Sequence, residues 1–114
     1  VQTRFANASK SEREKKNGVY EAEFDLDSTE YTVQVDQSGK IDAYKLDIPE
    51  NQLPASIVAA INNDYQGYKV DDAERLVKDG AIYYQVELEG KAKKDQQLVF
   101  TADGSKAVNI SYMN

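Results

Sequence analysis

Hydrophobic and polar residues alternate along the first half of the chain. In GVYEAEFDL, residues 18–26, every second position from residue 20 onward is apolar, and the positions between carry carboxylates. A period of two residues is typical of a β-strand with one face in the core and the other in water. We therefore predict a strand here, with its acidic row on the solvent side. The apolar row is Tyr20, Ala22, Phe24 and Leu26, and the acidic row is Glu21, Glu23 and Asp25.

Two more strands follow with the same alternation. The segment DST, residues 27–29, can turn the chain, so EYTVQVD, residues 30–36, is predicted to complete a hairpin. Asp, Ser and Gly in DQSGK, residues 36–40, favour a second turn, after which IDAYKLDI, residues 41–48, forms a third strand. The predicted inward residues are Tyr31, Val33 and Val35 in the former strand and Tyr44, Leu46 and Ile48 in the latter.

The period of the pattern changes after residue 49, where the only strong helix signal of the chain begins. Apolar residues then recur at i, i+4, i+7 and i+8, which predicts a helix over residues 53–65 that packs by one face. Pro54 suits the first turn, where its missing N–H costs nothing, and Gly67 can end the helix. The apolar stripe is Leu53, Ile57, Ala60 and Ile61.

Strand patterns return in the last third of the chain. A short strand through Leu76 and Val77 is predicted to end at an Asp79–Gly80 turn, and AIYYQVELEG, residues 81–90, then forms the next strand. Its apolar face carries Ile82, Tyr84, Val86 and Leu88, which places Tyr83 on the opposite, outward face. The last predicted strands carry Leu98 and Phe100 and, after an Asp103–Gly104 turn, Val108, Ile110 and Tyr112.

The two halves of the chain share one pattern. NGVYEAEFDL…YTVQVDQSGK in the first half matches DGAIYYQVEL…QLVFTADGSK about 60 to 65 residues later. We therefore predict two similar repeats, residues 1–50 and residues 51–114, that together form one compact domain. By this correspondence VQTRF, residues 1–5, is the end of a helix, so the helix of the first repeat is truncated.

The order of these segments resembles the PepSY-like, β-lactamase-inhibitor-like (BLIP-like) family of exported bacterial proteins common in gut Bacteroidetes. The segments that carry the resemblance are NGVYEAEF, VDQSGK, LPASIVAAINNDYQGYKVDDAE and TADGSK. The resemblance implies an α+β fold, in which each repeat contributes a helix and three or four strands to an antiparallel sheet with the helix packed on one face. It also implies a periplasmic or secreted location, and a signal peptide that has been removed from this chain.

The resemblance brings no catalytic motif with it. Relatives include propeptide domains of secreted peptidases and, at the level of fold, inhibitors of β-lactamase, so binding or inhibition is an expectation by analogy. The chain departs from the family in SKSEREKK, residues 9–16, which lacks the apolar residue that usually marks the first strand. We interpret this charged run as a solvated edge strand, and an electrostatic docking strip is the alternative.

Charge and residue content narrow the functional classes. Fourteen basic and twenty acidic residues give a net charge of −6, which disfavours nucleic acid and anionic lipid as partners. The chain has no histidine and no cysteine, so the usual nucleophile–base pairs and transition-metal ligand sets are missing. No apolar run reaches the roughly 20 residues of a membrane span. We therefore predict a protein that is not an enzyme, with no catalytic residue, cofactor or membrane insertion.

Carboxylates are the remaining source of chemistry. Glu21, Glu23 and Asp25 lie roughly 6.5 to 7 Å apart along a strand face, a spacing that glycosidases also use, but any solvated strand face has it. DLDSTE, residues 25–30, and DQSGKID, residues 36–42, loosely resemble the start of a calcium loop, yet neither continues to a bidentate Glu. We interpret both segments as turns and predict no metal site.

Tyrosines give the best binding signal, because tyrosine adds rigid apolar area with a polar tip at interfaces. Our candidate binding patch is Tyr83, Tyr20, Tyr31, Glu21 and Glu23. The leading hypothesis is an exported module that binds a secreted or periplasmic protein and restrains a hydrolase or peptidase. The alternatives are an envelope module that sequesters a small ligand or cation without a protein target, and a carboxylate-dependent hydrolase. The oligomeric state stays open.

Overall fold

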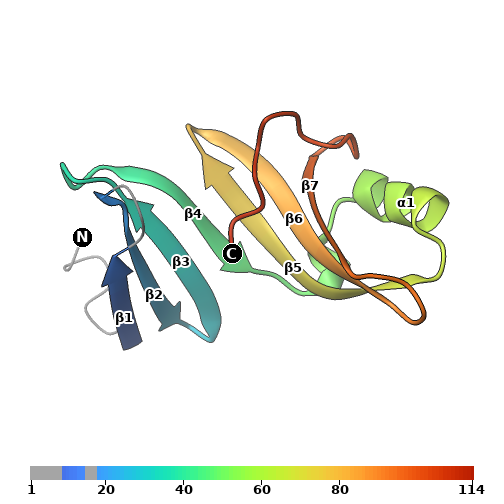
Figure 1. Ribbon diagram of the computed structural model, residues 1–114, viewed down its shortest axis with the longest axis horizontal. Helices are drawn as coiled ribbons and strands as arrows, with labels where there is room; N and C mark the ends of the chain where they lie inside the picture. Colours follow the sequence, from blue (N-terminus) through green and yellow to red (C-terminus); the bar gives the residue numbers. More distant parts are fainter. Residues whose placement is uncertain (1–8, 15–17) are drawn as a thin grey trace.

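A single antiparallel sheet organises the molecule. The computed structural model describes residues 9–14 and 18–114, and within them seven strands follow one another across the sheet in sequence order, each antiparallel to the next (Figure 1). From β2 onward, every connection except one is therefore a hairpin or short loop between neighbours. The strands are β1 (Ser9–Glu14), β2 (Tyr20–Leu26), β3 (Thr29–Val35), β4 (Ile41–Asp47), β5 (Tyr68–Lys78), β6 (Ala81–Gly90) and β7 (Gln96–Thr101).

The exception is the connection from β4 to β5, which contains a 3₁₀ turn, η2 (Glu50–Gln52), and the helix α1 (Ala55–Asp64). The predicted apolar stripe is confirmed, since Leu53, Ile57 and Ile61 are all buried. These side chains join a core cluster that includes Val86, Leu88 and Phe100 of the sheet. Burying each such side chain stabilises the fold by roughly 1.5–3 kcal/mol, so α1 is held by packing rather than by its caps.

The helix covers only one part of one sheet face, which we call the helix face. Its core cluster contains residues of β5, β6 and β7, and Figure 1 shows α1 beside β7 at the far end from β1. On the same face of β2 and β3, Phe24 is buried and its ring stacks on that of Tyr31 at 5.3 Å between centroids. The predicted helix remnant, residues 1–5, lies outside the described residues, and α1 is the one α-helix among those that are described.

The turns form where Asp, Ser and Gly predict them. Asp79 and Gly80 both have positive φ, 52° and 77°, as a two-residue hairpin turn requires. In the turn after β3, the Asp36 carboxylate accepts hydrogen bonds from the backbone N–H groups of Ser38 (2.9 Å) and Lys40 (3.0 Å). These bonds and the one from the Ser38 hydroxyl lower the pKa of Asp36, so the carboxylate serves the turn.

The C-terminal tail, residues 102–114, covers the opposite sheet face, which we call the tail face. Figure 1 shows it leaving β7, crossing β6 and β5, and ending near β4. Met113 is buried with Ala43, Leu76 and Val99 in a second core cluster. The predicted last strand through residues 108–112 is therefore wrong, since beyond one bridge, Phe100 with Lys106, these residues leave the sheet edge. Apolar burial on the tail face replaces pairing at the edge of β7.

The tail also corrects which side chains are buried. On β4 the buried residues are Ala43 and Lys45, whereas the predicted inward residues Tyr44, Leu46 and Ile48 are only half-buried. The strand lies between two covered faces, so both sets of side chains lose solvent. For the same reason Tyr83, predicted to point outward into solvent, is half-buried against the second core cluster.

The position of β1 and the length of β5 can also be compared with the predictions. The charged run 9–16 contains β1, which lies at the edge of the sheet as predicted, with β2 as its neighbour. β5 spans eleven residues and is much longer than the short strand expected around Leu76. Its first half, residues 68–72, pairs with residues 87–90 of β6, with a shift in register between Val70 and Asp72.

Candidate functional site

The sheet divides at one end, between β3 and β4. Pairing of these two strands stops at Tyr31 and Leu46. Beyond that point β3 stays with β2 as far as Thr29, while β4 stays with β5 as far as Asp47 and the Ile48 N–H donates to a carbonyl of β5 at 3.0 Å. The two strand pairs thus separate and leave a notch in the sheet.

Like charges explain why the pairing of β3 and β4 ends at this register. One more pair would place Glu30 directly opposite Asp47, and like charges directly opposite one another destabilise a sheet. Pro49 follows in the chain and cannot donate a backbone hydrogen bond to a ladder. The notch is therefore encoded in the residues that line it.

The notch forms a cleft of about 870 Å³, which we call the acidic cleft. One wall is the end of the β2–β3 hairpin, and the other is the connection from β4 into η2. The hairpin wall carries Asp25, Ser28, Thr29 and Glu30, and the other wall carries Leu46, Asp47, Ile48, Pro49 and Gln52.

Three carboxylates line this cleft from three strands. Asp25 of β2 is paired in register with Glu30 of β3, and Asp47 of β4 completes the set, which we call the cleft carboxylates. The strand alternation puts all three on the tail face, and it puts Leu46 and Ile48 on the helix face. Within the described part of the chain no ion pair reaches any of the three. The cleft is thus acidic on one side of the sheet and apolar on the other.

Asp47 has the most perturbed environment of the cleft carboxylates. Partial burial and, after it, the charges of Asp72, Glu74 and Glu30 together raise its pKa to about 7. Burial and the Glu74 charge also raise the pKa of Asp72. Both effects disfavour the charged form of a carboxyl group, so Asp47 exchanges its proton near neutral pH.

Glu74 connects the cleft to a buried polar network under the tail. Its carboxylate lies 2.9 Å from the Lys45 ammonium and accepts a 2.7 Å hydrogen bond from the Gln85 amide. Lys45 also donates to the Met113 carbonyl at 2.8 Å, and Gln85 exchanges two hydrogen bonds with the Met113 backbone, at 2.7 and 3.0 Å. Lys45, Glu74 and Gln85 are all buried, so this network fixes the end of the tail on the sheet.

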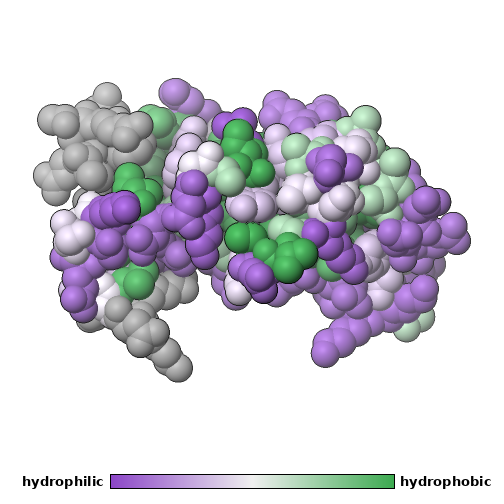
Figure 2. Space-filling model, turned by 90° about the horizontal axis from the view of Figure 1, so that it is seen from above, coloured by the Kyte–Doolittle hydropathy of each residue, from purple (hydrophilic) through white to green (hydrophobic). Residues whose placement is uncertain are grey.

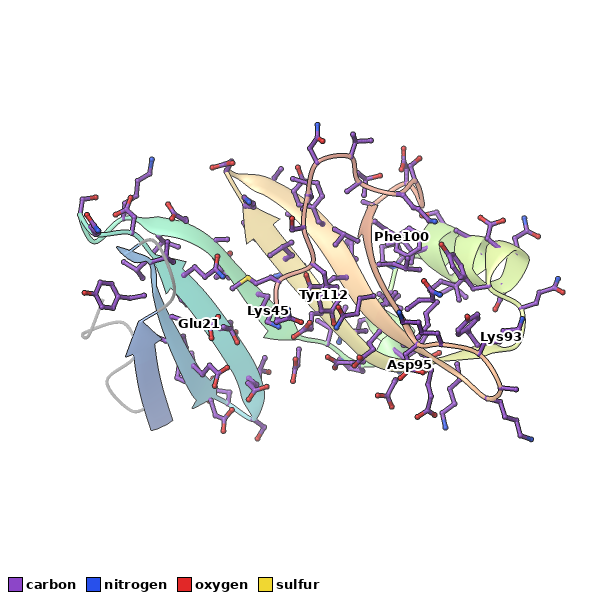
Figure 3. The ribbon with its side chains drawn as sticks, viewed as in Figure 1. Glu21, Lys45, Lys93, Asp95, Phe100 and Tyr112 are labelled. Atoms are coloured by element: carbon purple, nitrogen blue, oxygen red, sulfur yellow. The ribbon has the colours of Figure 1, made fainter. Side chains whose placement is uncertain are left out.

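Tyr112, the residue before Met113, lies near this network. Figure 3 shows Tyr112 and Lys45 at the same part of the sheet, where the tail ends. Burial raises the pKa of the Tyr112 phenol well above its usual value, and the charges of Glu74 and Asp72 raise it further. The phenol therefore stays neutral beside the carboxylates of Glu74 and Asp72.

A second set of carboxylates, which shares only Asp47 with the cleft, is a candidate group of metal ligands. Oxygen atoms of Asp47, Asp72 and Glu74 lie within 4.8 Å of one another, and carboxylate oxygens suit hard cations such as Ca²⁺. However, one Glu74 oxygen already contacts the Lys45 ammonium and the other accepts the Gln85 hydrogen bond. Both Glu74 oxygens are thus already engaged by groups of the protein itself, and we assign no metal site.

The structure does not bring the predicted patch residues together. Tyr20, 48% exposed, and Tyr31 belong to the helix face, whereas Glu21, Glu23 and Tyr83 belong to the tail face. Glu21 is only 1% exposed, so the prediction that the acidic row is uniformly the solvent side is wrong at this position (Figure 3). Glu21 engages neighbouring groups instead of water.

Sequence reasoning missed the cleft carboxylates as a group, although one signal was present. A two-residue turn at Asp27 and Ser28 fixes the hairpin register and places Asp25 opposite Glu30. Asp47 had no comparable signal, because its approach depends on where β4 leaves β3.

No family model matches the chain, and no curated protein matches it. Among the described residues, no helix has the length and apolar character needed to cross a membrane.

Several solved structures from Bacteroides are similar. A DUF2874 family protein from Bacteroides uniformis gives a TM-score of 0.80 at 16% identity, covering 92% of this chain and 79% of that one. A BLIP-like protein from Bacteroides fragilis gives 0.73 at 21% identity, covering 94% and 77%. A protein from Bacteroides eggerthii inferred to be periplasmic gives 0.82 at 14% identity, covering 92% and 78%. At these identities the likeness concerns the fold, and the chain has the BLIP-like α+β fold of these proteins.

Proposed function

We propose that this protein is a non-enzymatic, exported module that binds another protein through the acidic cleft. The observation that carries the proposal is the set of cleft carboxylates, which line a concave site without a basic partner among the described residues. Charge of one sign in a concave site attracts a partner of the opposite sign and speeds its association.

The shape of the cleft favours a protein over an enclosed small molecule. Asp25, Glu30, Pro49 and Gln52 are all exposed, so the cleft opens widely to solvent. Sites for small ligands usually enclose most of the ligand surface. An open cleft instead suits a protruding loop or side chain of a larger partner.

Electrostatics rather than a large apolar surface would guide this contact. On the face seen in Figure 2, apolar side chains of the described residues form separate groups, each bordered by hydrophilic ones. The large apolar residues that are exposed, such as Val108 at 80% and Ile82 at 51%, come from different elements. Scattered apolar residues of this kind are normal on a protein surface and do not define an interface.

An exported location and an inhibitory role are further parts of the proposal. One structural neighbour is inferred to be periplasmic and another is BLIP-like, which supports a periplasmic or secreted module. Restraint of a secreted hydrolase or peptidase is the narrower form of the proposal and rests on likeness of fold. The two similar repeats, residues 1–50 and 51–114, remain part of this proposed family relationship.

Photo-crosslinking from the cleft tests the proposal. A photoreactive residue replaces Thr29 in the cleft wall or, as a control, Lys91 in the exposed β6–β7 loop. We expect a protein of the native envelope or secreted fraction to crosslink from residue 29 only, and excess unlabelled wild-type protein to suppress the product. Equal products from both positions, or none from residue 29, would contradict binding at the cleft.

A carboxylate-dependent hydrolase is the second candidate, because Asp47 has a pKa near neutrality and lies in a cleft with other carboxylates. Among the residues that the structure describes, no aromatic side chain lines the cleft for a sugar ring to stack on. Assays with chromogenic glycosides decide between the candidates: turnover that Asp47→Asn abolishes would support the hydrolase and contradict the binding module.

A further inference from the structure

The chemistry of the acidic cleft indicates what part of a partner it accepts, an inference that rests on the proposed binding function. We propose that the cleft takes one arginine side chain of the partner, with its guanidinium among the cleft carboxylates and its aliphatic stem against Leu46 and Ile48.

The charge of the cleft favours a cationic ligand. Asp25 and Glu30 are directly opposite in register, a pairing that costs stability unless a cation lies between or beside them. Asp47 adds a third carboxyl group from the opposite wall. A cation placed among them relieves this repulsion, and none of the described basic residues does so.

The residues that line the notch belong to both faces of the sheet. Its carboxylates belong to the tail face, and Leu46 and Ile48 belong to the helix face. A ligand that fills the notch must therefore carry a cationic head and an apolar stem in line. Arginine and lysine have this form, and they bury their stems along apolar surface while the head reaches polar groups.

Arginine fits the carboxylates better than lysine. Its planar guanidinium offers five donors in a fixed fork, and it can bond two carboxylates at once while losing less hydration than an ammonium group. The Asp25–Glu30 pair offers two carboxylates side by side on adjacent strands. A bare divalent ion is a poorer match, because Ca²⁺ requires six to eight oxygen ligands and gains nothing from the apolar wall.

Proton release accompanies the binding of a cation here. The groups that face Asp47 are Glu30 of β3, Asp72 and Glu74 of β5, and, through Glu74, Lys45 of its own strand and Tyr112 of the tail. Burial and the charges of Asp72, Glu74 and Glu30 keep Asp47 partly protonated near neutrality, so a bound guanidinium displaces the proton. Affinity should rise about tenfold between about pH 6 and about pH 8 if only ionised Asp47 binds.

NMR titration of the whole chain with a short peptide tests the inference. The probe is acetyl-Leu-Arg-amide, and the matched control is acetyl-Leu-citrulline-amide, which has the same shape without the charge. We expect a Kd on the order of 1–10 mM for the arginine probe, tighter at the higher pH. Amide shifts should concentrate at Ser28, Glu30 and Ile48.

Variants complete the test. Asp47→Asn should weaken binding of the arginine probe and remove its pH dependence, whereas Asp64→Asn, which changes the net charge equally at the exposed end of α1, should leave both unchanged. Equal binding of the citrulline control, shifts away from the cleft, equal effects of the two variants, or peak shifts with calcium but not with the arginine probe would overturn the inference.

The two proposals fail differently. If a protein crosslinks from residue 29 and still binds the Glu30→Gln and Asp47→Asn variants, the cleft binds a partner but not through arginine. If the arginine probe binds while no protein crosslinks, the arginine site is supported and the protein-binding function is contradicted.

Discussion

Replacement of Asp47 by asparagine should stabilise the protein at alkaline pH and leave its stability unchanged in acid. Asp47 is half-buried, and Asp72, Glu74 and Glu30 surround it with negative charge. Asparagine has the shape of the protonated acid and no charge. The substitution therefore mimics at every pH the form that the native environment favours.

The sign follows from the two pKa values. The pKa of Asp47 is about 7 in the folded protein and 3.8 for an unperturbed group. A group with a raised pKa favours the folded state below the unfolded value, and this stability is lost as pH rises through the folded value. The difference corresponds to about 4 kcal/mol for a fully buried group, at 1.36 kcal/mol per pKa unit. Because Asp47 is still partly exposed to solvent, we expect about 1–2 kcal/mol.

Urea unfolding of both proteins from about pH 4 to about pH 8 measures the effect. The stability curves should coincide at the acidic end, and the variant should be more stable by about 1–2 kcal/mol at the alkaline end. Asp64→Asn is the control, because Asp64 is exposed. If wild type and Asp47→Asn lose the same stability over this range, or the variant is the less stable protein at alkaline pH, the like-charge environment is not real.

Three further predictions address the packing. Ile57→Ala, which empties a fully buried site under the sheet, should lower the free energy of unfolding by about 2–5 kcal/mol in urea titration; a loss below 1 kcal/mol would contradict the packing of α1. Gly104→Ala should lower the thermal stability clearly more than Gly39→Ala. Both glycines have φ near 90°, but only at residue 104 would the new Cβ lie 2.6 Å from a backbone oxygen of α1. Equal losses of stability would contradict this close approach. Lys45→Met should cost about 3–5 kcal/mol by leaving the Glu74 carboxylate buried without its cation, and the added change Glu74→Leu should restore most of it; an additive double-mutant cycle would refute the pairing.

Local signals predicted much of the fold. The helix stripe at Leu53, Ile57 and Ile61 and the Asp79–Gly80 turn were predicted because residues close in sequence determine them. The α+β class and the antiparallel sheet followed from these elements and from the resemblance. Strand faces were less certain, since alternation identifies two faces but does not say what covers them.

The C-terminal tail shows the limit of such signals. Val108, Ile110 and Tyr112 alternate with polar residues as in a strand. The tail nevertheless leaves the edge of β7 and packs on the tail face of the sheet. That choice depends on Ala43 and Leu76, which are far away in sequence. The tail also buries Lys45, so local sequence could not predict the burial of Lys45 either.

The acidic cleft combines both situations, and this explains why only part of it could be found in the sequence. The hairpin turn fixes Asp25 opposite Glu30, which is local information. Asp47 joins them only because β4 stops pairing with β3 after Leu46 and continues to pair with β5 as far as Asp47. Yet the reason for the separation is the same acidity, because closing the ladder would place Glu30 against Asp47. Glu30 and Asp47, two carboxylates on neighbouring strands, thus decide where the sheet opens, and the opening makes them a candidate site together with Asp25.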